Sequence, residues 1–293
     1  MDGKIFVTGA TGNVGGEVAW RLLQAGESVL AGYRSDEGGS ALRALGAETV
    51  RFDYRDKKTF NRALEGVDRV FLVSPPADPE APERVAPFIE AVKASDVRLI
   101  VDLSAMGADA DPSSPLFRIE EHIRFTGVEH VILRPNWFMQ NLKGFLFAGI
   151  VKQGGIFAPA GEGQTSFVDV RDIADVAVKA FREPGHEGNV YVLTGPRALS
   201  YGDVAQILRL ASGCDVSYVP LSEEDAREGL LDAGWPEDSV DYLLFLFKYV
   251  REGATAGVSA DVKQVLGRAP RSLEKFARDY ANLFRECVAG AEA

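Results

Sequence analysis

The sequence predicts an α/β fold, a Rossmann-type doubly wound parallel sheet with a smaller, mostly helical C-terminal subdomain. Short apolar runs alternate with amphipathic segments through the first half of the chain, as in repeated strand–helix–strand units. These runs are almost continuously apolar, which is expected of parallel strands that helices cover on both faces. A glycine-rich segment joins the first run to the first amphipathic segment, as at the opening of such sheets.

Six strands are expected in the first half, each rich in Val, Ile, Leu or Phe. They are residues 4–7, 29–33, 49–52, 69–73, 99–103 and 131–133. The intervening helices are visible as well. Val14, Val18 and Leu22 recur at helical spacing, and Gly26 ends that run.

The pattern changes after about residue 150, where several glycines precede a strand-like segment at 165–168 and a helix at 170–181. Residues 1–155 are expected to form the Rossmann domain, with residues 164–195 returning to its sheet. Residues 196–293 are expected to form the mainly helical subdomain on the substrate side. Within it, residues 222–241 hold eight acidic residues and one basic residue, which favours a solvated acidic helix face.

The composition excludes several classes of protein. The 293 residues include 32 Lys and Arg against 43 Asp and Glu, a net charge of −11 that argues against a nucleic-acid partner. No apolar run approaches the ~20 residues of a membrane span, and no signal peptide is recognisable, so a cytoplasmic protein without a membrane partner is expected. Two cysteines and three histidines are too few for a Cys/His metal site, so no metal is expected.

The clearest chemical motif is the segment VTGATGNVG at residues 7–15, between the first strand and the first helix. Gly9 permits the tight turn, Gly12 lets a pyrophosphate approach the backbone, and Gly15 allows the helix to pack closely on the strand. The amides and the positive dipole end of the helix then face an anion. The motif predicts a dinucleotide site, with a tight turn that binds nothing as the alternative.

Three segments together resemble the NmrA-like group of atypical short-chain dehydrogenases. They are VTGATGNVG at 7–15, LRPNWFMQN at 133–141 and FVDVRDIA at 167–174, and the resemblance extends from residue 4 to about residue 212. It implies a nicotinamide cofactor and no particular substrate. The group includes quinone, triphenylmethane-dye and imine or iminium reductases as well as catalytically silent redox sensors.

The end of the second strand favours NADP(H). Arg34 follows that strand, and its guanidinium suits a 2′-phosphate, which a carboxylate would repel. Asp36 and Glu37 follow closely and are the alternative partners of a ribose diol. NADP(H) is therefore the preferred cofactor, and NAD(H) is possible.

Other cofactor contacts are expected where strands end, because ligands of open α/β sheets bind at the carboxyl ends of the strands. The resemblance implies that Asp53 and Tyr54 approach the adenine, while turn capping is the alternative for Ser74 and Ser104. The complete predicted cofactor set is Gly9, Thr11, Gly12, Asn13, Val14, Arg34, Asp53, Tyr54, Ser74, Pro75, Ser104, Ala105, Met106 and Pro135.

The expected catalytic helix lacks the Tyr-x-x-x-Lys pair of ordinary short-chain dehydrogenases, because residues 115–126 contain neither Tyr nor Lys. We therefore expect substrates that accept hydride without a strong built-in acid. Ser104, Glu120 or water are the candidate proton donors, and Glu120 needs burial to raise its pKa for that task. Its neighbours Arg118 and Arg124 suggest an ion-paired helix face as the alternative.

The substrate is expected to contact the loop after the sixth strand, through Asn136, Trp137, Phe138, Met139 and Asn141. The flat apolar groups would stack on a planar molecule while Asn136 or Asn141 orients a carbonyl. The alternative is that Trp137 and Phe138 are buried in the junction between sheet and subdomain.

These observations lead to one principal function and two alternatives. The principal one is an NAD(P)H-dependent reductase that transfers hydride to a small conjugated electrophile, such as a quinone, an enone, an imine or an iminium ion. The alternatives are a non-catalytic NADP(H)-sensing regulatory protein and a non-redox isomerase or cyclase. The expected partner is a small-molecule substrate, and the chain is expected to be a monomer or a homodimer.

Overall fold

A seven-stranded parallel sheet lies at the centre of the first part of the chain, in the order β3-β2-β1-β4-β5-β6-β9. Its strands are β1 (Lys4–Val7), β2 (Val29–Tyr33), β3 (Glu48–Arg51), β4 (Val67–Val73), β5 (Leu99–Leu103), β6 (Glu129–Pro135) and β9 (Val190–Leu193). Every neighbouring pair is parallel. The strand order reverses between β1 and β4, which confirms the predicted Rossmann-type fold.

The computed structural model describes residues 3–285, and they divide into two compact units. Unit 1 contains the sheet and comprises the described residues up to 135, together with 170–193 and 261–268. Unit 2 comprises residues 136–169 and 194–260 and the described residues from 269 onward. Each unit is therefore built from three separate stretches of the chain.

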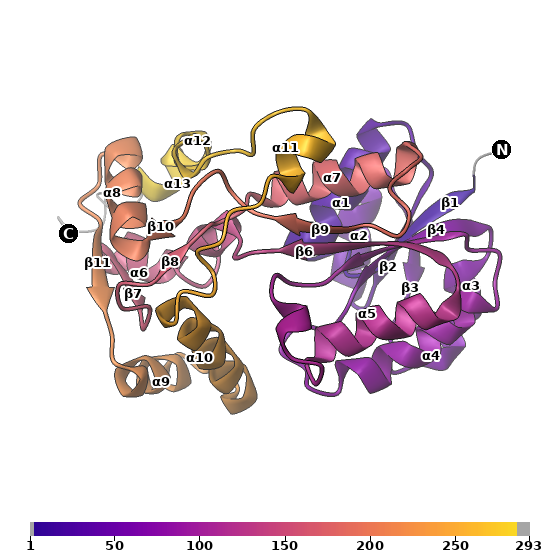
Figure 1. Cartoon of the computed structure of the whole chain (residues 1–293), viewed down its shortest axis with the longest axis horizontal. Coiled ribbons are helices and arrows are strands. Elements are labelled where there is room, and N and C mark those ends of the chain that lie inside the picture. Colours follow the sequence, from indigo (N-terminus) through magenta and orange to yellow (C-terminus); the bar gives the residue numbers. More distant parts are fainter. Residues whose placement is uncertain (1–2, 286–293) are drawn as a thin grey trace. The chain divides into compact units, whose positions relative to one another are not determined.

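Helices cover both faces of the sheet in unit 1 (Figure 1). Helices α1 and α7 pack on each other over one face, and α4 and α5 do so over the other. Phe6, Phe52 and Phe88 fill the core on the α4 side through edge-to-face contacts. The helical elements of unit 1 are α1 (Asn13–Gln24), α2 (Asp36–Ala44), η1 (Lys57–Thr59), α3 (Phe60–Leu64), α4 (Ala81–Lys93), η2 (Ala108–Ala110), α5 (Pro115–Thr126), α7 (Val170–Arg182) and α11 (Asp261–Leu266).

Unit 2 is mostly helical, as predicted for the C-terminal part, and has its own core around Tyr201, Phe247 and Phe276. Two small sheets add to it, a parallel pair of β7 with β11 and an antiparallel pair of β8 with β10. Its elements are η3 (Met139–Lys143), α6 (Phe147–Gln153), β7 (Gly155–Ala158), β8 (Gln164–Thr165), β10 (Leu199–Ser200), α8 (Tyr201–Ser212), β11 (Ser217–Pro220), α9 (Glu223–Asp232), α10 (Glu237–Arg251), α12 (Leu273–Asp279) and α13 (Ala281–Arg285).

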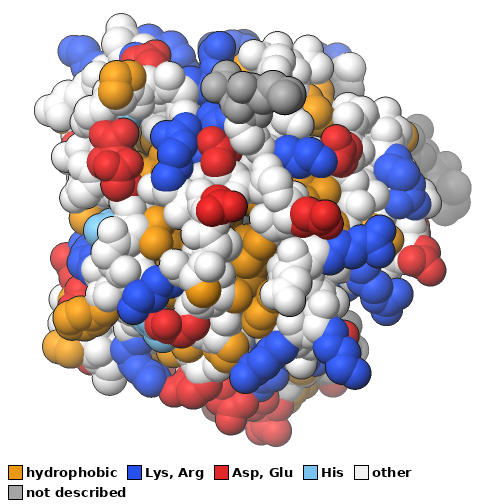
Figure 2. All heavy atoms as spheres, turned by 90° about the vertical axis from the view of Figure 1, so that its right-hand side faces the viewer, with side chains coloured by type: hydrophobic (Ala, Val, Ile, Leu, Met, Phe, Trp, Pro, Cys, Tyr) orange, Lys and Arg blue, Asp and Glu red, His pale blue; other side chains and the backbone are white. Residues whose placement is uncertain are grey.

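The acidic residues of α9 are exposed, and Ala226 is the buried residue of this helix. Two arginines pair with carboxylates there, Arg227 with Asp241 and Arg251 with Glu223. On the face of the molecule that Figure 2 shows, acidic and basic side chains alternate and neither sign dominates. Among residues 3–285, no helix combines the length and the hydropathy that crossing a membrane requires.

Candidate functional site

The loop between β1 and α1 leaves the first amides of α1 open to solvent. Gly9 has a φ of 59°, in the left-handed region that favours glycine, and Thr11, Gly12 and Asn13 are exposed. Gly12 is the N-cap of α1, and no side chain accepts a hydrogen bond from the amides of the first turn. That turn also contains no acidic residue. Free amides and an uncompensated positive dipole end fit an anion such as a diphosphate.

Close packing explains the third glycine of the loop. A Cβ atom on Gly15 would lie 2.3 Å from the carbonyl oxygen of Gly9, whereas one on Gly12 would lie 3.2 Å from the same oxygen. Gly15 therefore allows the helix to approach the turn, while a Cβ on Gly12 would be close to this one oxygen and otherwise in open space. The side chain of Val14 is buried and anchors the start of the helix beneath the loop.

Arg34 directly follows β2 and is exposed. Within the described part of the chain its guanidinium has no hydrogen bond or ion pair. Ser35, the next residue, caps α2 by accepting a hydrogen bond from the Gly38 amide. Asp36 and Glu37 belong to the first turn of that helix. Arg34 is thus a cation without a partner at the end of the strand next to β1.

Asp53 and Tyr54, which follow β3, both form hydrogen bonds within the protein. The Tyr54 hydroxyl lies within hydrogen-bond distance of two acceptors, Thr8 Oγ1 at 3.2 Å and the Val73 carbonyl oxygen at 3.1 Å. Burial raises the pKa of this phenol far above its usual range. Asp53 accepts a hydrogen bond from the amide of Arg55. The Tyr54 hydroxyl is therefore committed inside unit 1, and only its ring remains for an adenine.

The sheet brings the other predicted cofactor residues into one row. Val73 pairs with Leu103 and Leu103 pairs with Leu133, so the carboxyl ends of β4, β5 and β6 lie side by side. The row consists of Ser74 and Pro75 after β4, Ser104, Ala105 and Met106 after β5, and Pro135 at the end of β6. The Met106 amide donates to the Pro135 carbonyl oxygen and fixes the last two of these strand ends.

A buried ionic cluster lies behind this row. The Glu120 side chain on α5 is fully buried and accepts hydrogen bonds from Ser104 Oγ at 2.5 Å and from Nε and Nη2 of Arg134 at 2.9 and 2.6 Å. Nη2 of Arg124 adds a contact at 3.2 Å. The hydrogen bonds that Arg134 donates to Glu120 are the main reason why the pKa of Arg134 is raised. A carboxylate held by two guanidinium groups is an acceptor, so the structure favours the ion-paired alternative over the general-acid role for Glu120.

Asp102 adjoins this cluster and was not singled out in the sequence. It lies in the central strand β5, is 1% exposed, and its Oδ1 has no hydrogen-bond partner. Burial raises the pKa of its carboxyl well above the usual range, and the negative charge of Glu120 raises it further. The available signal was an acidic residue inside an otherwise apolar run at 99–103.

The predicted substrate loop lies in unit 2, where part of it is structural. The Asn136 amide donates to Ser166 Oγ at 2.7 Å and to the Thr255 carbonyl oxygen at 2.8 Å, and its oxygen accepts from the Trp137 amide. Both amide hydrogens are used, so Asn136 has none left to orient a substrate carbonyl. Met139 is likewise buried in the core, at 1% exposure.

The remaining members of the loop are half-buried. Trp137 packs on Phe247 of α10, with ring centroids 4.9 Å apart, and Phe138 forms an isolated bridge with Val168. Asn141 lies within η3. Trp137, Phe138 and Asn141 therefore remain the candidate substrate contacts on this loop, although Trp137 also packs against the core of unit 2.

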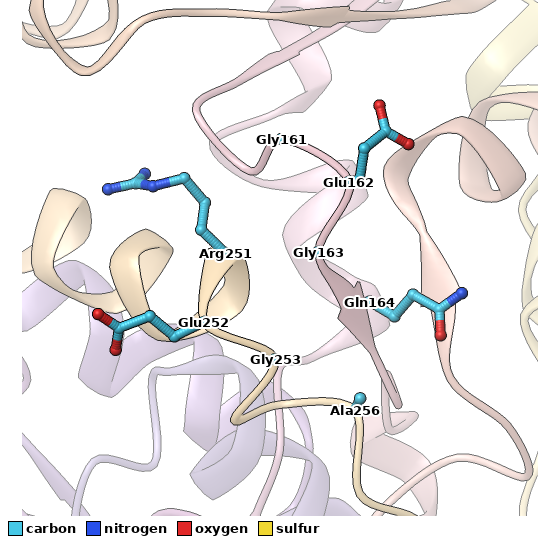
Figure 3. A pocket seen from close by; sticks show the side chains of 8 residues that line it. All are labelled: Gly161, Glu162, Gly163, Gln164, Arg251, Glu252, Gly253 and Ala256. Atoms are coloured by element: carbon cyan, nitrogen blue, oxygen red, sulfur yellow. The ribbon is translucent and has the colours of Figure 1, made fainter.

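Unit 2 contains a surface pocket of about 470 Å³ between the loop at 161–164 and the turn at 251–256 (Figure 3). The side chains of Glu162 and Arg251 point away from each other. Arg251 bonds to the Pro159 carbonyl oxygen and to Glu223 instead. None of the lining residues belongs to the predicted site. Across residues 3–285, no three His, Cys, Asp or Glu side chains are grouped as metal ligands would be.

Comparisons with known proteins place the chain in a family. The model of the NmrA-like family matches residues 1–277. An NAD(P)H azoreductase from Xenophilus azovorans is 36% identical over 284 residues, which are 96% of this chain and 99% of that protein. Quinone oxidoreductase 2 from Escherichia coli is 31% identical over 82% of this chain and 85% of its own length.

Solved structures agree with these matches. The NADPH complex of the NADPH-dependent quinone oxidoreductase of Escherichia coli superposes with a TM-score of 0.83, at 28% identity and with 94% of this chain and 99% of that chain covered. Triphenylmethane reductase of Citrobacter sp. with NADP(H) gives a TM-score of 0.82 at 25% identity, covering 95% and 99%. The chain is therefore an oxidoreductase, and it belongs to the NmrA-like family.

Proposed function

We propose that the chain is an NADPH-dependent reductase that transfers hydride to a small conjugated electrophile, such as a quinone, an enone, an imine or an iminium ion. The observation that carries this proposal is the open amide end of α1 beside the unpartnered Arg34. The similarity to reductases named for NAD(P)H, quinones and triphenylmethane dyes supports it.

Different residues at the carboxyl ends of the strands would bind different parts of the cofactor. The loop at Gly9, Thr11, Gly12 and Asn13 would hold the diphosphate through backbone amides, and Arg34 would bind a 2′-phosphate with its donor fork. The row from Ser74 to Pro135 would flank the nicotinamide half. The nicotinamide supplies the hydride, and the protein supplies position and exclusion of water.

The proton that follows the hydride is proposed to come from water. Helix α5 contains neither Tyr nor Lys. The Ser104 hydroxyl donates its hydrogen bond to Glu120, and Glu120 accepts from arginines. Substrates that delocalise or neutralise the added charge suit such a site, because they need little acid assistance. Trp137 and Phe138 would stack on a planar substrate, and Asn141 would offer it an amide.

One observation favours a second function. The absence of a Tyr-x-x-x-Lys pair from α5 is also what a non-catalytic NADP(H)-sensing protein would show. Turnover separates the two functions. We expect calorimetry to detect NADPH binding, and NADPH absorbance to fall when a quinone or a cationic triphenylmethane dye is added with the protein.

Each outcome of this experiment has a separate meaning. Cofactor binding with no loss of absorbance over a panel of quinones, enones and iminium compounds would favour the sensor. Failure of both NADPH and NADH to bind the intact chain would overturn both functions.

A further inference from the structure

We propose that Ser104 is a hydrogen-bond acceptor for the carboxamide N–H of the nicotinamide, and that Glu120 and Arg134 are positioning residues that keep it so. This inference rests on the proposed function, because it requires a bound nicotinamide dinucleotide. Ser104 then accepts a hydrogen bond from the cofactor and is not a proton donor, and the buried Glu120 has a role other than acid catalysis.

The first step concerns the single proton of the Ser104 hydroxyl. Ser104 Oγ lies 2.5 Å from Glu120 Oε1, and two oxygens at that separation need a hydrogen between them. Glu120 is not the donor, because both of its oxygens already accept hydrogen bonds from guanidinium groups, which can only donate. The serine is therefore the donor, and its oxygen presents lone pairs in the other directions.

The second step is that this arrangement is fixed. Arg134 holds both oxygens of Glu120 through its planar fork, so the carboxylate cannot rotate away from the serine. The third nitrogen of Arg134 pairs with Asp109 on η2, which fixes the guanidinium itself. Glu120 and Arg134 are 0% and 7% exposed, so water does not compete for these bonds.

The third step concerns the ligand group that meets the serine. Ser104 follows β5, between the ends of β4 and β6, in the row proposed to flank the nicotinamide. Its amide donates to the Leu133 carbonyl oxygen, so the backbone position is set by the sheet. The serine oxygen can accept and has no proton left to donate. The carboxamide NH₂ is the donor on the nicotinamide ring, and the two groups are therefore complementary.

The test uses a dinucleotide that lacks this donor. The 3-acetylpyridine analogue of NADPH replaces the carboxamide by an acetyl group, which retains the carbonyl oxygen and has no N–H. We expect Ser104→Ala to weaken NADPH binding by roughly 3- to 10-fold, the effect of one neutral hydrogen bond. The same change should leave the affinity for the analogue unaltered, as measured by calorimetry without any substrate.

Ser95→Ala is the matched control, because the Ser95 hydroxyl bonds only to its near neighbours Val92 and Val97 at the end of α4, among the described residues. It should change neither affinity. Equal weakening of both dinucleotides by Ser104→Ala would overturn the inference, since the serine would then donate to the carbonyl oxygen or act through the fold. Wild-type protein that binds neither dinucleotide would instead overturn the proposed function.

A second variant reverses the polarity of the pair. In Glu120→Gln, the amide oxygen is expected to replace Oε2, because both partners of Oε2 are guanidinium groups that can only donate. The NH₂ then replaces Oε1 and faces Ser104, at the cost of the hydrogen bond that Oε1 accepts from Arg134 Nε. The serine would accept from this amide and point its own proton outward. We expect the ratio of the Kd for NADPH to the Kd for the analogue to rise relative to wild type. A ratio that stays the same or falls in a folded variant would contradict the inference.

Discussion

Arg34 decides the choice between the two nicotinamide dinucleotides if the proposed function is correct. Arg34→Asp replaces a free guanidinium by a carboxylate beside the expected 2′-phosphate, so NADPH should bind about 10- to 100-fold more weakly, the effect of losing charge-assisted hydrogen bonds. NADH, which has no phosphate there, should lose much less affinity. Calorimetric titration of both dinucleotides measures the difference.

Arg62→Asp is the control for this change, since Arg62 is an exposed arginine on α3 and the substitution alters the net charge equally. It should leave both affinities within about twofold of wild type, because exposed charges at a distance are screened by salt. If Arg34→Asp lowered the two affinities by the same factor, Arg34 would not contact a 2′-phosphate.

Asp102 makes the free energy of unfolding depend on pH. The raised pKa means that the folded protein keeps a proton that the unfolded chain releases above about pH 4. The contribution of Asp102 to stability therefore falls as pH rises from that point towards the pKa of the folded state. Asp102→Asn removes the titration, so its stability relative to wild type should improve with pH by at most about 1.4 kcal/mol per pH unit.

Urea unfolding between pH 4 and pH 8 measures this difference. Asp96→Asn serves as the control because Asp96 is exposed after α4, and its difference from wild type should stay flat over the same range. A flat difference for Asp102→Asn as well would mean that Asp102 is ionised in the folded protein.

Single residues also show where sequence reasoning stops. Glu120 was recognised as a candidate, but its partner Arg134 follows 14 residues later on a different element, and only the fold brings them together. Asn136 was assigned to the substrate on its residue type, whereas its amide bonds to a carbonyl oxygen 119 residues away. Such side chains are interpreted correctly only when their distant partners are known.

Secondary-structure elements were more predictable than contacts. The strands at 4–7, 29–33 and 99–103 were predicted with their observed bounds, because continuous apolar runs mark strands buried on both faces. The last strand of the first half is longer than its apolar run, since β6 extends from Glu129 to Pro135 by pairing with its neighbours. The short strands of unit 2 were mostly missed, because two to four residues carry no periodicity.

The loop before α1 gives a prediction that separates binding from stability. Gly12 has a φ of −89°, which any residue can adopt, so Gly12→Ala should fold with a loss of no more than about 1 kcal/mol. Its new methyl group would occupy the open side of the loop and weaken both dinucleotides at least tenfold. Gly15→Ala would place Cβ 2.3 Å from a backbone oxygen and should cost about 1–3 kcal/mol of stability.

Urea unfolding and calorimetry distinguish the two glycine variants. Gly26→Ala is a useful comparison, because Gly26 has a φ of 80° and an added Cβ would meet nothing within 4 Å, so its cost is backbone strain alone. Unchanged dinucleotide affinity in folded Gly12→Ala would show that the loop is only a turn, which was the alternative interpretation of the motif.

The whole chain passes from one unit to the other after residues 135, 169, 193, 260 and 268. The sequence predicts domains at 1–155 and 196–293, with residues 164–195 returning to the sheet, but it does not show when a still later helix belongs to unit 1 as well. Helix α11 is an example, since it contacts α7 and β9 of unit 1 although it follows most of unit 2 in the sequence.

This connectivity predicts that the molecule unfolds in one step. Neither unit is a continuous piece of chain, so melting one unit would leave the stretches of the other joined by long, free loops, whose closure costs entropy. Heating should therefore give a single calorimetric transition. NADPH at 100 times its Kd should stabilise the folded chain by about 2.7 kcal/mol and move that transition as a whole. Two transitions, of which NADPH moves only one, would show that the units unfold independently.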